Sequence, residues 1–201
     1  MLDVDRVTGP GDTGRPLPAP ASNLVLRVVS AIVLAPLAIF AAYLGDWPFT
    51  LFWAIAAIAV LWEWIALAVG PGYRLMFSAC GSAVGVSALL AWLNRPIAAV
   101  MLIGLGALAA AIFAPSGRRG WITAGIGYAG ALLLAPVLLR DDLAYGFGAI
   151  LLLFAVVWTT DVLGYFAGRA IGGPKLWPAV SPKKTWSGAV AGVLGAMIVA
   201  V

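Results

Sequence analysis

The sequence predicts an all-α fold, a polytopic bundle of helices that crosses a membrane several times. Of the 201 residues, 63% are hydrophobic and only 10% are charged, whereas soluble domains carry about 25% charged residues. The apolar residues gather in runs of about 18–21 residues, and a helix of this length spans about 30 Å of hydrocarbon. Turn-forming or charged residues separate the runs.

The chain begins with residues 1–23, which are rich in proline and glycine and carry mixed charges. This composition cannot bury a core, so we expect a disordered tail on the cytoplasmic side. It is not a signal peptide, because no basic segment precedes a short apolar stretch. Residues 24–201 are expected to form a single transmembrane domain.

Six full spans and a shortened seventh are expected within this domain. The six lie at residues 24–44, 49–69, 76–93, 97–114, 121–139 and 146–166. The seventh begins near Trp186 and reaches Val201 after about 16 residues, or about 24 Å of helix, which falls short of the hydrocarbon thickness. We therefore expect the chain to end inside this span.

The basic residues predict the orientation of the spans. With six spans, one side of the membrane carries ten of the twelve lysines and arginines. These ten are Arg6, Arg15, Arg27, Arg74, Arg118, Arg119, Arg169, Lys175, Lys183 and Lys184, and the other side carries Arg95 and Arg140. Because cytoplasmic loops are enriched in lysine and arginine, the N-terminus is expected in the cytoplasm. The net charge of +4 then concerns orientation and does not indicate a nucleic-acid partner.

Several kinds of site are excluded by composition. The chain has no histidine and one cysteine, Cys80, so it has no histidine-ligated metal, no histidine base and no internal disulfide. Any metal ion would be held by oxygen ligands.

Two acidic residues lie inside expected spans. Asp161 is in the sixth, and Glu63 is in the second at a similar depth. A charged side chain costs a few kcal/mol at membrane depth, so an acid there indicates a functional site, here a shared polar cavity. The alternative for Glu63 is a structural acid paired with an arginine or a backbone group.

The run SPKKT at 181–185 is expected to begin a helix, with Ser181 as the N-cap and Pro182 at the first helical position. Lys183 and Lys184 would then lie in the first turn, where the helix dipole disfavours cations. A bound phosphate would explain this placement, because free backbone N–H groups and two ammonium groups attract an anion. Simple anchoring at the cytoplasmic interface is the alternative. The glycine-rich run at 168–173 is expected to be a flexible loop.

Together these residues resemble a known enzyme family. Asp161-x-x-Gly-Tyr-Phe-x-Gly-Arg169-x-x-Gly172, followed by Ser181-Pro-Lys-Lys-Thr-Trp-x-Gly188, is similar to the phosphatidate cytidylyltransferases (CDP-diacylglycerol synthases). Arg27 and the pair Glu63-Trp64 also resemble that family. The block at 158–192 is specific, and the rest of the resemblance, from about residue 24, is generic apolar helix.

The resemblance implies a nucleotidyltransferase of phospholipid biosynthesis. CTP and phosphatidate from the inner leaflet of the cytoplasmic membrane would give CDP-diacylglycerol and pyrophosphate, with Mg²⁺ and as a homodimer. Asp161 would be a catalytic residue and metal ligand, and Lys183 and Lys184 catalytic phosphate contacts. Arg169, Ser181 and Thr185 would be further phosphate-binding residues.

One departure concerns the C-terminal signature of the family, which contains a histidine and further aspartates. This chain ends before such a region, so we expect either a fragment or a degenerate relative, and a 201-residue chain that is inactive alone.

Two other functions stay open. A small transporter could use Asp161 and Glu63 in an ion path, and a lipid or polyprenol kinase could use CTP as phosphate donor.

Overall fold

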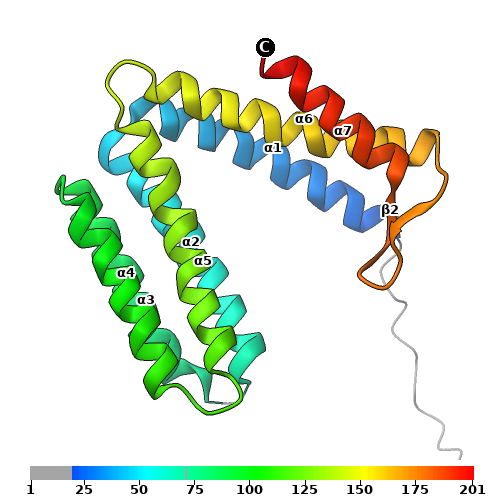
Figure 1. Ribbon diagram of the computed structural model, residues 1–201. Coiled ribbons are helices and arrows are strands. Elements are labelled where there is room, and N and C mark those ends of the chain that lie inside the picture. The colour runs from blue at the N-terminus through cyan, green and yellow to red at the C-terminus, as the bar shows by residue number, and fades with distance from the viewer. Residues whose placement is uncertain (1–19, 71) are drawn as a thin grey trace, which may run out of the picture. The chain divides into compact units, whose positions relative to one another are not determined.

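The computed structural model describes residues 20–70 and 72–201, which form helices and one two-stranded sheet (Figure 1). The helices are α1 (Pro20–Leu44), α2 (Asp46–Val69), α3 (Tyr73–Trp92), α4 (Pro96–Phe113), α5 (Arg119–Arg140), α6 (Gly146–Ala170) and α7 (Trp186–Val199). The predicted helical class is confirmed, and each expected span coincides with a helix to within a few residues.

Five helices of the described chain, α2 to α6, are long and apolar enough to cross a membrane. Two further apolar helices of the described residues are shorter. They are the part of α1 from Val29 to Leu44 and the whole of α7. The expected tail lies mostly at residues 1–19, outside the described residues.

Contacts divide the chain into two units, Met1–Leu37 and Ala38–Val201. The described part of the first unit is the beginning of α1, whose side chains from Val29 to Leu37 are mostly exposed and apolar. The second unit contains the end of α1 and all the other elements.

Helices α2, α3, α4 and α5 of the second unit pack together into a bundle. Small residues allow the helices to approach closely: a Cβ added at Gly125 would lie 2.6 Å from Trp64 Cδ1, and one added at Gly130 would overlap Ile103. The Trp64 indole also donates a hydrogen bond to the Trp121 carbonyl, at 2.8 Å. Glycine contacts of this kind are typical of helix packing in lipid, where no hydrophobic force drives helices together.

Helices α6 and α7 lie side by side and are the most closely packed pair of the fold (Figure 1). Gly188 contacts the backbone of α6: a Cβ at Gly188 would stand 2.5 Å from the Gly164 carbonyl oxygen and 3.2 Å from Gly168 Cα. A Cβ at Gly192 would stand 3.0 Å from the Thr160 oxygen. The glycines of α7 therefore hold it against the half of α6 that follows Thr159.

Arg140 connects the end of α5 to its neighbours. Its Nε donates to the Ala42 carbonyl of α1 at 2.7 Å, and its guanidinium lies 5.6 Å from the centre of the Phe147 ring. The guanidinium also lies beside Gly45, whose φ of +66° suits glycine.

Candidate active site

The polar face of α6 carries the acid that the sequence singled out. Asp161, Tyr165 and Arg169 are exposed and follow one another at four-residue spacing, so they share one face of the helix. The Arg169 guanidinium donates to the Tyr165 hydroxyl at 3.0 Å. Eight residues of helix place Asp161 about 12 Å along the axis from Arg169. This face therefore has a negative group deeper in the span and a positive group at its end.

An antiparallel hairpin follows α6 and carries the three lysines of this region. Gly172 and Gly173 turn the chain with φ values of +66° and +98°, and strands β1 (Lys175–Trp177) and β2 (Ser181–Thr185) then pair. Lys175 is opposite Thr185 and Trp177 is opposite Ser181.

This register leaves Pro182, Lys183 and Lys184 of β2 opposite Leu176 alone, so β2 bulges between Ser181 and Thr185, in the segment that carries the two lysines. Both lysines are exposed. Proline lacks a backbone N–H and is tolerated at bulges. Bulges often lie next to active sites, where they redirect side chains.

The predicted helix start at Ser181 is wrong. Ser181 and Pro182 belong to β2, and α7 begins at Trp186 with Thr185 as its N-cap. The Thr185 hydroxyl accepts the Gly188 N–H at 3.3 Å, and the Pro174 carbonyl accepts the Trp186 N–H at 3.1 Å. The serine–proline signal depends only on neighbouring residues. The folded hairpin supplies partners for Thr185 and Trp186. These contacts decide where the helix starts.

This correction changes the argument for a phosphate at the helix end. Lys183 and Lys184 precede the N-cap of α7, so they do not occupy the first helical turn, and the argument from that position no longer applies. The N–H groups of Trp186 and Gly188 are bonded within the protein, so they are not free to bind an anion. The case for phosphate binding now depends on the two exposed ammonium groups of the bulge and on Arg169.

Thr185 and Ser181 differ in how accessible their hydroxyl groups are to a bound phosphate. Thr185 is only 6% exposed, and its hydroxyl also lies 3.5 Å from the Gly168 carbonyl and 3.0 Å from the Ser187 hydroxyl. Ser181 is half-buried in the hairpin. Thr185 thus has a clear structural role at the junction of α6, β2 and α7.

Two further expectations concern α6 and α2. The run at 168–173 is not all loop, because α6 continues through Gly168 and Arg169 to Ala170. Glu63 is exposed on α2, and neither it nor Asp161 lines either of the two cavities described in this unit. The shared cavity of Glu63 and Asp161 stays a prediction.

A magnesium ion would find one carboxylate here. Within the described residues, no three histidine, cysteine or acidic side chains come together. Mg²⁺ keeps several waters and is commonly bound by one or two carboxylates plus substrate phosphates. Asp161 fits such a role when nucleotide phosphates complete the coordination.

Sequence reasoning gave no role to Tyr165, which it quoted within a motif, or to Ser187. The spacing of Tyr165, midway between Asp161 and Arg169, could have placed it on the same face. Ser187 donates to the Gly172 carbonyl at 2.5 Å, and no local signal indicates this contact.

Comparisons with known proteins agree on one family. The model of the cytidylyltransferase family matches residues 25–201. A protein named phosphatidate cytidylyltransferase from Brucella abortus is 40% identical over 181 residues, which cover 88% of this chain and 66% of the relative. Proteins of the same name from Pseudomonas aeruginosa and Rickettsia bellii are 30% and 27% identical, over 83% and 89% of this chain and 65% and 57% of their own lengths. The chain thus spans somewhat less than two thirds of these relatives. No solved structure matches it.

Proposed function

Because the chain belongs to the cytidylyltransferase family, we propose that it serves the transfer of CMP from CTP to phosphatidate, with release of pyrophosphate. The sequence resemblance to this family is confirmed, and the relatives at up to 40% identity carry the name phosphatidate cytidylyltransferase. The observation that carries the proposal is the bulge of β2, which presents Lys183 and Lys184 just beyond the end of α6.

The chemistry requires cations at the membrane surface. A phosphate oxygen of phosphatidate attacks the α-phosphorus of CTP, the P–O bond to the β-phosphate breaks, and the electron pair leaves on pyrophosphate. The attacking phosphate is already ionised, so no general base is needed. The protein must chiefly position the reactants and offset their negative charge. Lysines act here as mobile point charges.

We assign the roles as follows. Lys183 and Lys184 bind phosphate oxygens of CTP, with Ser181 as a minor contact. Thr185, which the sequence also predicts as a contact, serves the site by fixing the end of β2. Arg169, held by Tyr165, binds a phosphate of the lipid or the nucleotide. Asp161 holds Mg²⁺, which supplies charge neutralisation when bound.

The membrane arrangement is part of the proposal. Six full spans and a seventh that begins at Trp186 place the N-terminus and the hairpin in the cytoplasm, where CTP is present. The site then lies at the inner surface of the cytoplasmic membrane, which both the lipid and the soluble nucleotide can reach. A homodimer follows from the family resemblance.

The test compares two labels on CTP. The chain is reconstituted alone and as a fusion in which the C-terminal third of the Brucella relative follows Val201. We expect the fusion to move label from the α-phosphorus into the lipid when phosphatidate and Mg²⁺ are present, and label from the γ-phosphorus into pyrophosphate. Label from the γ-phosphorus in the lipid would instead identify a kinase and overturn the proposal.

In the fusion, Lys184→Ala is expected to lower transfer at least tenfold, because it removes a cation beside several phosphates. Asp161→Asn should lower the rate and weaken its dependence on Mg²⁺. Lys175→Ala is the matched control, since it removes the same charge from β1. If Lys175→Ala and Lys184→Ala lose activity equally, general surface charge explains the lysines.

A further inference from the structure

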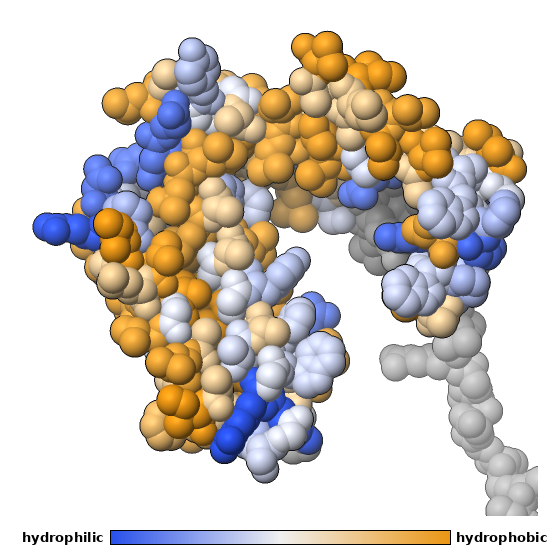
Figure 2. Space-filling view, viewed as in Figure 1, coloured by the Kyte–Doolittle hydropathy of each residue, from blue (hydrophilic) through white to orange (hydrophobic). Residues whose placement is uncertain are grey.

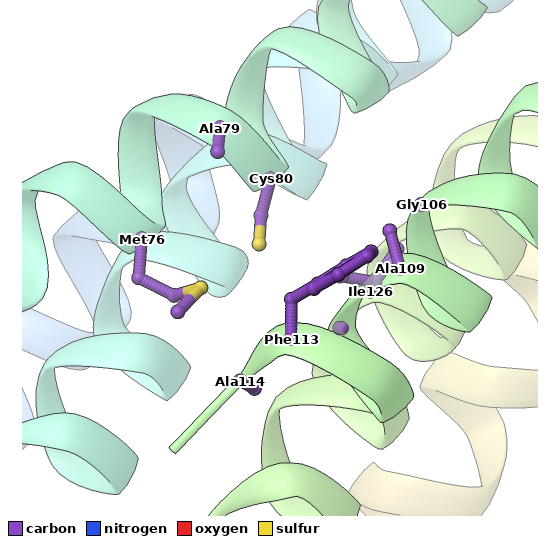
Figure 3. A pocket seen from close by; sticks show the side chains of 9 residues that line it. Met76, Ala79, Cys80, Gly106, Ala109, Phe113, Ala114 and Ile126 are labelled. Carbon is purple, nitrogen blue, oxygen red and sulfur yellow. The ribbon is translucent and has the colours of Figure 1, made fainter.

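One cavity of the second unit lies at the end of the α2–α5 bundle where α3 and α5 begin. Its volume is about 190 Å³, and every residue that lines it is apolar or cysteine (Figure 3). The lining residues are Met76, Ala79, Cys80, Gly106, Ala109, Ala110, Phe113, Ala114 and Ile126. An apolar cavity of about 150 Å³ already holds a benzene molecule, so this one can hold part of an acyl chain.

The cavity is a groove that is partly open. Cys80, Ala110 and Ile126 are buried and form its floor, whereas Ala109 and Phe113 on α4 are exposed at its rim. Figure 3 shows Met76, Ala79 and Cys80 on one side of the cavity and Phe113 and Ala109 on the other. Because these helices belong to a multi-pass membrane protein, the open side can be reached from the lipid phase.

Three arginines lie at the same end of the bundle as the groove. Arg74 lies in the first turn of α3, and Arg118 and Arg119 lie where α5 begins. The Arg119 side chain donates to the carbonyl of Ala114, a lining residue, at 2.9 Å. Arg118 reaches the α2–α3 turn, with its guanidinium 3.9 Å from the Cβ position of Gly70. Hydrophilic residues gather at this lower end of the bundle in Figure 2.

Charge decides which occupant fits. An acyl chain gains little from leaving the bilayer for an apolar groove, because lipid tails are as apolar as the lining. The preference must then come from the head group, and each basic residue near the membrane surface contributes about 1 kcal/mol of attraction to anionic lipid. Trp121, which is 63% exposed beside these arginines, is typical of the membrane interface.

We propose that this groove binds an anionic glycerophospholipid of the bilayer, with one acyl chain against Cys80 and Ile126 and the phosphodiester against Arg74, Arg118 and Arg119. This lipid site is separate from the polar face of α6 and does not depend on the proposed transfer. We choose a lipid whose phosphate is a diester because it lacks the phosphomonoester that accepts CMP in the proposed transfer.

The test uses photoreactive lipids. The chain is reconstituted in phosphatidylcholine nanodiscs that contain a small fraction of either phosphatidylglycerol or phosphatidylcholine, each with the same diazirine-bearing acyl chain. After irradiation, the adducts are mapped by mass spectrometry. We expect adducts on the segments 76–80 and 109–114 to be at least about five-fold more abundant with phosphatidylglycerol, the ratio that the contribution of a single arginine, about 1 kcal/mol, gives.

Variants separate the head group from the groove. Arg74→Gln together with Arg118→Gln should reduce the preference several-fold, and Arg119 is retained because it bonds the end of α4. Arg95→Gln, at the start of α4 at the opposite end of the bundle, is the matched control and should keep it. Ala109→Trp, which fills the rim, should reduce adducts in the groove with both lipids.

Three results would overturn the inference: equal labelling of the groove by the two lipids, a preference that is unchanged in the double variant, or no adducts in the groove with either lipid. The last result would point to a groove that a second copy of the chain covers. Lys184→Ala should leave the labelling unchanged, so failure of the transfer assay and failure of this inference are distinguishable.

Discussion

Thr185 joins three parts of the chain through one side-chain oxygen. That oxygen lies within hydrogen-bond distance of the Gly168 carbonyl of α6, the Ser187 hydroxyl and the Gly188 N–H of α7. The methyl group of valine would fill a similar volume but could make none of these bonds. The role of Thr185 is therefore to set the point where β2 ends and α7 begins.

We predict that Thr185→Val lowers stability by about 0.5–2 kcal/mol, the usual cost of losing an N-cap. Thr185→Ser keeps the hydroxyl and should stay close to the original protein. Thermal unfolding in detergent, followed by circular dichroism, measures both. Equal melting temperatures for valine and serine would show that the cap contributes nothing.

Asp141, at the end of α5, is a second residue that is expected to affect the stability of the folded protein. Burial raises the pKa of its carboxyl, nearby Asp46 raises it further, and Arg140 partly opposes this. The folded protein therefore binds this proton more tightly than the unfolded chain, and stability falls as pH rises from the ordinary aspartate value through the raised pKa. The loss persists at neutral pH.

Asp141→Asn is accordingly expected to raise the melting temperature at pH 7 and to have no such effect below the ordinary aspartate pKa. Asp142→Asn removes the same charge from the next residue, but the Asp142 carboxylate accepts the N–H groups of Ala144 and Tyr145 at 3.0 and 2.7 Å. Asp142→Asn should therefore give no gain in melting temperature. A stabilisation by both variants would point to net charge as the cause.

At the scale of elements, α6 and α7 form one unit because their glycines let two backbones touch. The Gly188 Cβ position is 2.5 Å from the Gly164 oxygen, closer than real Cβ atoms approach. The polar face of α6 and the hairpin lysines depend on this pair, since β2 leads directly into α7.

Gly188→Ala is expected to destabilise the α6–α7 pair by about 1–3 kcal/mol, the usual cost of overpacking. Gly148→Ala, also on α6, meets nothing within 4 Å and should be neutral or stabilising by up to about 1 kcal/mol. Unfolding in mixed micelles compares the two. Equal effects would mean that the tight contact is not maintained in the membrane.

At the scale of the whole molecule, the arginines mark the two ends of the α2–α5 bundle. Arg74, Arg118 and Arg119 lie where α3 and α5 begin, and Arg95 and Arg140 lie where α4 begins and α5 ends. This arrangement follows from the order of the helices, and the enrichment of basic residues predicts that the first end is cytoplasmic.

Orientation is tested with single cysteines in a Cys80→Ser background. Lys175 and Leu143 are exposed beyond opposite ends of α6. A cysteine at Lys175 should react with an impermeant maleimide only after the membrane is opened, and one at Leu143 should react in intact cells. The reverse pattern would contradict the proposed orientation.

The positions of the helices could be predicted from the sequence because they depend on local composition. Apolar runs between turn-forming residues are long enough to span the hydrocarbon, and in lipid each helix must satisfy its backbone within itself. Asp161 and Arg169 were also identifiable, because a charged residue in or next to an apolar run is conspicuous in any fold.

The junction before α7 was decided only by the tertiary structure. Ser181 and Pro182 form a reasonable local start signal, yet the Trp186 N–H bonds to Pro174 and the Thr185 hydroxyl lies beside Gly168. These partners are 12 and 17 residues away in sequence, so no window of local pattern contains them. The same holds for the groove between α3 and α4, whose lining comes from three helices. The approximate position of each helix in this chain is determined by local sequence. Contacts between distant segments determine where α7 starts and which helix faces remain open to a ligand.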